Sequence, residues 1–356
     1  MNWKKLTENG KLPEPRTSFG MVAHKGRIIV FGGLIGKDKQ DNEVFVYDLN
    51  KQEWEHVKTT GEKPKARSVF VSELFENKMI IFGGIGEMLP EYECFNDVWQ
   101  LDLETFEWEE LKITGKIPTP RFAHSSAILD NKMYIFGGYE INYEEFGPPL
   151  LNEIWELDLK EKKWIEINAQ GELPSSRFSP VTTACYVPDD QGNMRPMLFC
   201  YGGGGGFSGL ETTYNEFHIF DISTSTWELV ELSTQTPPLR AGTLLPFFSK
   251  DKVLSLLLFG GVNELGNAGW VVNNDLWLID PFKKTAFLVD DDEVDFDKTV
   301  SPRYSHKSVL VDNHMVVFGG WDGQWNGFQN DMFMVDVNSL LELKEKEKDE
   351  KEKDEK

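Results

Sequence analysis

The chain has 356 residues, with 37 Lys and Arg against 59 Asp and Glu, which gives a formal net charge of -22 at pH 7. This balance argues against nucleic acid as a partner, because binding nucleic acid requires Lys and Arg to neutralise phosphates, and it favours a basic protein or peptide. The N-terminus lacks the apolar segment of a signal peptide, no stretch approaches about 18 uninterrupted apolar residues, and the three cysteines have neither an even count nor metal-ligand spacing. We therefore expect a cytoplasmic or nuclear protein with reduced thiols and no membrane span.

One pattern recurs six times along the chain: an apolar run that ends in a double glycine. A continuous β-branched and aromatic run bounded by glycine is typical of a buried strand, and the glycines mark where the backbone leaves it in a conformation that a Cβ would obstruct. The six copies are IIVFGG at 28–33, MIIFGG at 79–84, MYIFGG at 133–138, LFCYGG at 198–203, LLLFGG at 256–261 and MVVFGG at 315–320.

The residues around each double glycine also repeat. Downstream comes Asn followed by an acid, which opens a second strand that ends in Asp. Six residues after the first four of these Asp stands a Trp, and thirteen residues after each Trp stands an Arg that opens another apolar strand; the fifth copy slips by one residue and has Phe287 instead of Trp. The unit therefore has four strands in about 50 to 65 residues, the period of a propeller blade. The Asn residues are Asn42, Asn96, Asn152, Asn215, Asn274 and Asn330, and the Trp and Arg pairs are Trp54 with Arg67, Trp108 with Arg121, Trp164 with Arg177 and Trp227 with Arg240.

These motifs, in fixed order from Trp3 to Asp336, resemble those of the kelch-repeat family of β-propellers. The resemblance implies an all-β fold, a six-bladed propeller of four-stranded blades. It is specific for the fold and not for a function, because one fold hosts many functions.

The first residues of the chain are expected to close the ring. Trp3 precedes Arg16 by thirteen residues, as in the blades, whereas no Trp stands six residues after Asp336. Residues 1–10 would then supply the outer strand of the last blade and remove the open edge between the two ends of the ring, so that residues 1–340 form one propeller. The alternative is that Leu340 to Leu343 forms this strand.

In chain order, we predict six sets of inner strands, one long insertion and a tail. The insertion, Val187 to Pro196, lengthens blade four and is expected to be a surface loop on the face opposite the double glycines. Residues 341–356 are rich in alternating Lys and Glu and are predicted to form a charged low-complexity tail. The inner three strands are expected within residues 16–48, 67–102, 121–158, 177–221, 240–280 and 303–336.

The repeated residues are interpreted as structural. A Trp that recurs at one register is expected to pack between neighbouring blades, and the Arg that follows is expected to form hydrogen bonds from blade to blade, although a ring of six Arg could also gather an anion. His124 and His306 lie in opposite blades without a recurring third ligand, and the glycines at 202–206 lack the Lys-Ser/Thr of a phosphate-binding loop. We therefore expect no metal, no cofactor and no catalytic site.

The segments between each double glycine and the following Asn are expected to emerge on one face, together with the connections from each outer strand to the next blade, such as Asp290 to Asp297. These segments differ from blade to blade and are rich in aromatic residues and acids. We call the surface that they form the loop face and predict that it binds a partner, because Trp and Tyr are enriched at binding hot spots. The alternative is that some of these aromatic side chains fold back and cover the ring. The candidate residues are Glu87, Tyr139, Glu140, Tyr143, Glu144, Glu145, Phe207, Trp270, Asp291, Trp321, Asp322, Trp325 and Phe328.

The predicted function is that of a non-catalytic scaffold or adaptor, a monomeric propeller that binds a protein or peptide with a basic segment. Kelch-type proteins resembling this one often serve as ubiquitin-ligase substrate receptors, cytoskeletal factors or trafficking effectors, and the sequence does not choose among these roles. Two alternatives are an enzyme that transforms a sugar or other small molecule in the central pocket, as in kelch-like sialic-acid isomerases, and a carbohydrate-binding propeller. A deep pocket with convergent Arg and Glu would favour the enzyme.

Overall fold

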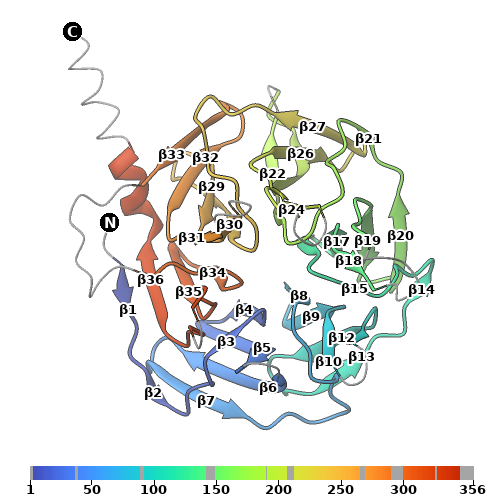
Figure 1. The fold of residues 1–356 in the computed structure, drawn as a ribbon, viewed down its shortest axis with the longest axis vertical. Helices are drawn as coiled ribbons and strands as arrows, with labels where there is room; N and C mark the ends of the chain where they lie inside the picture. Colours follow the sequence, from blue (N-terminus) through green and yellow to red (C-terminus); the bar gives the residue numbers. More distant parts are fainter. Residues whose placement is uncertain are drawn as a thin grey trace.

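The computed structural model describes residues 3–36, 39–88, 92–141, 149–189, 191–206, 212–264, 269–289, 300–324 and 327–344. These residues form six β-sheet blades arranged in a ring around a central axis, together with one short helix over residues 337–344 (Figure 1). The predicted six-bladed propeller is confirmed. In each blade four strands follow one another in antiparallel order from the axis outward. In blade one the second of these strands also pairs with a further short strand, and blades one, three and four each gain a short strand at the outer edge.

The strands of the blades follow the predicted sequence ranges. In blade one they are β3 (Arg16–Thr17), β4 (Gly20–His24), β5 (Arg27–Ile35), β6 (Lys39–Asp48) and β7 (Glu53–Val57), and in blade two β8 (Val71–Phe75), β9 (Lys78–Phe82), β12 (Val98–Asp102) and β13 (Trp108–Glu110). Blade three has β16 (Ser125–Leu129), β17 (Lys132–Phe136), β19 (Ile154–Asp158) and β20 (Lys163–Ile167), and blade four has β22 (Val181–Pro188), β23 (Met194–Tyr201), β26 (Phe217–Asp221) and β27 (Thr226–Val230). Blade five has β28 (Thr243–Phe248), β29 (Leu254–Phe259), β32 (Leu276–Asp280) and β33 (Thr285–Leu288), and blade six has β34 (Lys307–Val311), β35 (His314–Phe318), β36 (Met332–Asp336) and β1 (Lys4–Lys5).

Short additional strands pair outside this pattern. On the loop face they form the pairs β10 (Ile85–Met88) with β11 (Tyr92–Cys94), β15 (Arg121–Phe122) with β18 (Tyr139–Glu140), β24 (Gly204–Gly205) with β25 (Thr212–Thr213), and β30 (Val262–Glu264) with β31 (Trp270–Val272). At the outer rim, the connections between blades add parallel pairs with the outer strands, through β2 (Asn9–Gly10), β14 (Thr114–Gly115) and β21 (Gln170–Gly171).

The N-terminal strand closes the ring, as predicted. Strand β1 pairs antiparallel with β36, with Lys4 opposite Met334, and the Leu6 amide donates to the Met332 carbonyl at 2.8 Å. The first and last strands of the propeller, β1 and β36, therefore lie side by side in blade six (Figure 1). Because paired backbone groups replace an open sheet edge, this closure protects the ring from edge-to-edge association.

The alternative closure by Leu340 to Leu343 is wrong, because these residues lie in the helix over 337–344. Leu340 is fully buried in a cluster of side chains from blades five and six, and Leu341 and Leu343 pack against the same cluster. This helix includes the first residues of the predicted charged tail, and residues 345–356 lie outside the described residues.

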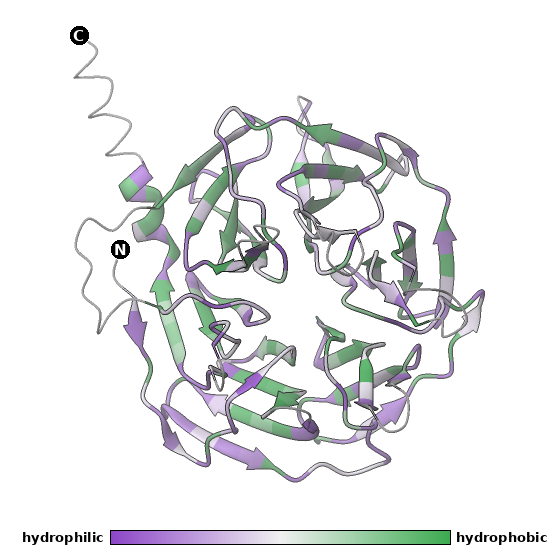
Figure 2. Ribbon diagram, viewed as in Figure 1, coloured by the Kyte–Doolittle hydropathy of each residue, from purple (hydrophilic) through white to green (hydrophobic). Residues whose placement is uncertain are grey.

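The repeated Trp packs between blades, as predicted. Trp108 of blade two lies 4.7 Å (ring centroids) from Phe31 of blade one, and Trp164 of blade three lies 5.0 Å from Phe82 of blade two. Each Trp therefore covers the last aromatic residue before the double glycine of the preceding blade. The remaining pairs of this kind are Trp227 with Phe136, Trp54 with Phe318 and Trp3 with Phe259. Hydrophobic residues fill the middle strands of the blades, while the outermost strands carry more hydrophilic residues (Figure 2).

The double glycines leave their strands in left-handed backbone conformations. At Gly84, φ is +94°, and an added Cβ would lie 2.7 Å from both the Phe70 Cβ and the Ser68 carbonyl oxygen. Backbone conformation and close packing thus both require glycine, as the sequence pattern indicates.

The insertion in blade four extends two strands instead of forming only a loop. Strands β22 and β23 continue pairing through Val187 with Arg195 and Pro188 with Met194. The Asp189 carboxylate accepts hydrogen bonds from the Gln191 and Asn193 amides in the turn. The predicted surface loop is therefore confined to this short turn.

Candidate binding surface

Buried arginines hold the loop face to the blades. Arg67 donates from Nη1 to the Gly83 carbonyl at 3.1 Å and to the Asp97 carboxylate at 2.6 Å. These side-chain bonds stay within one blade. The predicted hydrogen bonds between blades are made by the Arg backbone, since the Gly33 amide of blade one donates to the Arg67 carbonyl at 2.9 Å. In blades two, three, four and six the carboxylate partner of the Arg directly follows the repeated Asn, whereas in blade one the partner is Asp41, which precedes Asn42, and not Glu43. The equivalent ion pairs are Arg16 with Asp41, Arg121 with Glu153, Arg177 with Glu216 and Arg303 with Asp331.

The repeated Asn makes a further bond between blades. The Asn96 amide group donates to the carbonyl of Pro118, in the connection that enters blade three, at 3.0 Å. Asn330 donates in the same way to Pro13 at 3.2 Å and so links the last blade to the first. The other four bonds run from Asn42 to Pro64, Asn152 to Pro174, Asn215 to Thr236 and Asn274 to Val300.

A closed ring of six backbone hydrogen bonds surrounds the axis beneath the loop face. The Ser18 amide donates to the Ser305 carbonyl, the Val69 amide to Ser18, and so on around the ring until the Ser305 amide donates to Ala241, with N to O distances between 2.6 and 3.1 Å. All six residues are non-glycine with φ between 48° and 57°, a conformation that is costly on its own. The cyclic hydrogen bonding requires this conformation. The ring of bonds fixes the position at which the chain enters each blade. The ring residues are Ser18, Val69, Ala123, Ser179, Ala241 and Ser305.

Blade five enters the ring one residue early, which corrects the prediction for Arg240. The Gly203 amide donates to the Leu239 carbonyl, the bond that Gly84 makes to the repeat Arg, Arg121. Leu239 therefore occupies the position of the repeat Arg and is buried. The separation from the bonding Asn to its acceptor carbonyl is 21 residues here and 22 in the preceding blades, so a deletion in the connection shifts the register.

The shift places Arg240 in a row of side chains on the loop face. It takes the position that Phe122 and Phe178 have in blades three and four, directly after the repeat Arg. The Phe122 ring stacks on Tyr139 at 5.4 Å, and Tyr139 stacks on Phe178 at 4.7 Å. The Arg240 guanidinium lies 4.9 Å from the Phe178 ring and 5.8 Å from the Trp270 ring. We call Phe122, Tyr139, Phe178, Arg240 and Trp270 the ladder; it crosses blades three, four and five.

The ladder combines two predicted residues with three that the sequence interpretation missed. Tyr139 and Trp270 were candidates, and Trp270 is 54% exposed. Phe122, Phe178 and Arg240 were missed, although the residue after each repeat Arg is aromatic in blades three, four and six and could have been recognised. Ring stacking and the cation-π contacts hold these side chains in place. Phe178 is buried, Phe122, Tyr139 and Arg240 are half-buried, and Trp270 stays exposed.

A second aromatic group lies on blade six and is partly folded on itself. Trp321 packs 5.4 Å from Tyr304 and 5.8 Å from Phe328, and its indole N–H donates to the Gln324 carbonyl at 2.6 Å. The Asp322 carboxylate accepts from the Gln324 amide at 2.8 Å and thereby orders the turn. Trp321, Asp322 and Phe328 are half-buried.

The acidic candidates are only partly described. Glu87 is exposed, and Glu140 is half-buried in the strand pair with Arg121. The candidates Tyr143, Glu144, Glu145, Phe207, Asp291 and Trp325 lie outside the described residues.

Two of the buried histidines each lie beside a strand that ends at a double glycine. His124 and His306 pack edge-on against Phe82 and Phe259, and burial lowers the pKa of both imidazoles well below the ordinary value. Among the described residues, no group of three or more His, Cys, Asp or Glu is placed to hold a metal ion. Within the same ranges, no helix is both long and apolar enough to span a bilayer. The three cysteines are free thiols.

Six four-stranded blades, each with a double glycine, a bonding Asn and a closing strand, define a kelch-type propeller. The chain matches the model of the KLHDC2/KLHL20/DRC7 Kelch-repeats domain over residues 1–190 and 193–351, and it belongs to the kelch-repeat family.

Similar proteins include a Leucine-zipper-like transcriptional regulator 1 homolog of Drosophila melanogaster, 28% identical over 331 residues, and human Host cell factor 1, 27% identical over 360 residues. These matches cover 89% and 94% of this chain but 31% and 17% of the two relatives. Human Host cell factor 2 is 25% identical over 348 residues, which cover 91% of this chain and 42% of the relative. The chain thus spans less than half the length of these relatives.

Proposed function

We propose that the protein is a non-catalytic interaction scaffold that binds a segment of a partner protein across the ladder on its loop face. The observation that carries this proposal is Trp270, a large aromatic side chain that is 54% exposed and held beside Arg240. Trp, Tyr and Arg are the residues that dominate binding energy at protein interfaces. The names of the matched relatives, a transcriptional regulator and a host cell factor, denote no catalysed reaction.

Charge supports a partner with basic groups around an apolar or aromatic anchor. The chain carries a net charge of -22, and Glu87 and Glu140 lie on the loop face. Arg240 adds a local cation within the ladder, where an aromatic side chain of the partner can stack on it. The surrounding acids would speed association with a basic segment and would make it sensitive to salt. A monomeric propeller in the cytoplasm or nucleus is part of this proposal.

The test is affinity capture with three baits from cells that make the protein. One bait is the intact chain, one carries Trp270→Ala with Arg240→Ala, and the control carries Phe282→Ala. Phe282 is 51% exposed and lies in the turn after β32, on the opposite face of the ring. We expect the same partner with the intact and control baits and its loss with the double variant. Equal recovery by all three folded baits would refute the proposal.

The dissociation constant of the recovered segment, measured for each variant, then gives the size of the effect. Truncating a Trp hot spot costs about 2 kcal/mol or more, so its dissociation constant should rise about thirtyfold or more for Trp270→Ala. The Phe282→Ala variant should leave the dissociation constant unchanged within about twofold, since isolated surface substitutions have effects within about 0.5 kcal/mol.

A further inference from the structure

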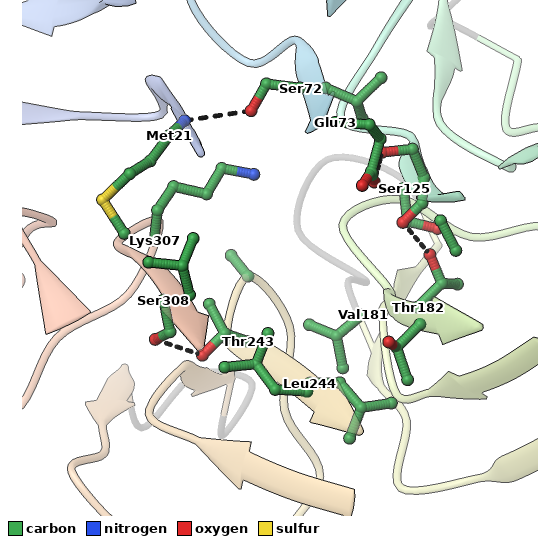
Figure 3. A pocket seen from close by; sticks show the side chains of 18 of the residues that line it. Met21, Ser72, Glu73, Ser125, Val181, Thr182, Thr243, Leu244, Lys307 and Ser308 are labelled. Carbon is green, nitrogen blue, oxygen red and sulfur yellow. Dashed lines mark hydrogen bonds between the residues drawn. The ribbon is translucent and has the colours of Figure 1, made fainter. Parts of the chain in front are cut away.

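The axis of the propeller contains a cavity of about 390 Å³. The first strand of every blade, namely β4, β8, β16, β22, β28 and β34, contributes to its wall (Figure 3). This volume lies near the lower end of the range of about 300–1,000 Å³ that is usual for small-molecule sites. A small metabolite fits such a space, whereas a folded segment of another protein does not.

Two side chains of opposite charge, one acidic and one basic, face one another across this cavity. Glu73 extends from β8 and Lys307 from β34, and the Lys307 ammonium points toward the Glu73 carboxyl (Figure 3). Glu73 accepts a hydrogen bond from the Ser126 hydroxyl at 2.6 Å. Lys307 forms no hydrogen bond or ion pair with any residue in the described ranges, so its donors are open to a ligand.

Burial disfavours the charge on both groups. It raises the pKa of the Glu73 carboxyl, against the hydrogen bond from Ser126 and the charge of Lys307. It lowers the pKa of the Lys307 ammonium, against the charge of Glu73. A ligand that brings a charge of the opposite sign close to each group would stabilise the charged forms that burial disfavours.

Hydroxyl groups complete a polar wall. The Ser308 and Thr243 hydroxyls bond to each other at 2.8 Å near Lys307, and the Ser72 hydroxyl, next to Glu73, accepts from the Met21 amide at 3.0 Å (Figure 3). Among the described residues of the wall, Glu73 is the one acidic side chain and Lys307 the one Lys or Arg side chain. The other ionisable side chains of the wall, among the same residues, are His124 and His306.

We propose that the central cavity binds a small zwitterion of the size of a free amino acid, with its ammonium at Glu73 and its carboxylate at Lys307. A simple anion would satisfy Lys307 but would be repelled by Glu73, and a simple cation would meet the reverse problem. A neutral ligand would leave both charges without a partner. This site is separate from the ladder and does not rest on the proposed function.

The experiment measures binding of the common free amino acids to the full chain by calorimetry and by the change in Tm. Each ligand that binds is compared with its amide, which lacks the carboxylate, and its N-acetyl form, which lacks the ammonium. We expect at least one amino acid to bind saturably and both analogues to bind at least about tenfold more weakly, because each loses a charge-assisted bond.

Three variants test the placement of the ligand. Glu73→Gln and Lys307→Met should each weaken binding at least about tenfold. Lys25→Met, which removes an exposed lysine that pairs with Glu104 on the surface, should leave it unchanged. If a substitution in the cavity unfolds the protein, the two analogues alone decide the result.

Three outcomes would overturn the proposal. The first is that no amino acid binds, and the second is that binding persists in both cavity variants. The third is that a simple carboxylate binds as tightly as the zwitterion and depends on Lys307 alone. The Trp270→Ala, Arg240→Ala variant should retain amino-acid binding, so failure here is distinguishable from failure of the loop-face proposal.

Discussion

Removing the side chain that anchors the closing strand should destabilise the whole ring. Trp3 is 3% exposed and packs 5.4 Å from Phe259 of blade five, in a cluster that joins blades five and six. Truncation of a buried Trp to Ala costs about 3–5 kcal/mol, because apolar contacts are lost and a cavity remains. A natural domain has only about 5–15 kcal/mol of unfolding free energy, so this is a large share of it.

The assay is thermal and denaturant unfolding of Trp3→Ala beside Lys4→Ala. With an unfolding entropy of about 2 cal/mol/K per residue over about 340 residues, the loss corresponds to a fall in Tm of about 4–7 °C. Lys4 is exposed on the same strand, so its substitution should change Tm by less than about 1 °C.

Deleting residues 1–10 is a larger perturbation, because it also removes the buried Leu6 and leaves the outer edge of β36 unpaired. Aggregation should follow, since an open strand edge pairs with other chains. A truncated protein that keeps the Tm and the monomer content of the intact chain would refute the account of ring closure.

Three further predictions concern the frame of the ring and its pH response. Gly84→Ala should lower the unfolding free energy by about 1–3 kcal/mol, measured in denaturant, because an added Cβ has no room at a φ of +94°. Arg67→Met should cost about 3–5 kcal/mol, because the Asp97 carboxylate loses its buried partner; an unchanged transition midpoint would contradict this role. The pKa of His124 and of His306 in the folded protein lies well below the ordinary value of 6.5. As the pH falls through 6.5, the unfolded chain therefore binds more protons than the folded protein. The unfolding free energy is thus highest above pH 6.5 and decreases below it. Stability should fall by up to about 1.4 kcal/mol per pH unit for each His, and His306→Asn should show a shallower slope between about pH 6 and 5.

The sequence predicted those parts of the fold that each blade must repeat. Packing of Trp108 on the preceding blade, the glycine at Gly84 and the pairing of Lys4 with β36 all follow from local requirements that recur at fixed spacing. A residue that must fill one type of site in every blade leaves a periodic trace. The trace is readable without knowledge of the partners across the ring.

The sequence did not predict the features that depend on register across blades. In blade five the repeat position falls at Leu239, one residue earlier than the spacing predicts. The residue after it, Arg240, stands thirteen residues after Trp227, so spacing alone assigned the repeat position to Arg240. Only the hydrogen bond from Gly203 to Leu239 reveals the shift. Similarly, the facing of Glu73 and Lys307 joins blades two and six, and no local pattern links residues so far apart in the chain.

The most direct test of the loop-face claim is photo-crosslinking to the captured partner. A photo-reactive amino acid is placed at Val271, which is exposed beside Trp270, and in a second protein at Phe282 on the opposite face. The account predicts a crosslink to the partner from position 271 and none from position 282. A crosslink from position 282 alone, or none from position 271 while the partner is bound, would contradict it.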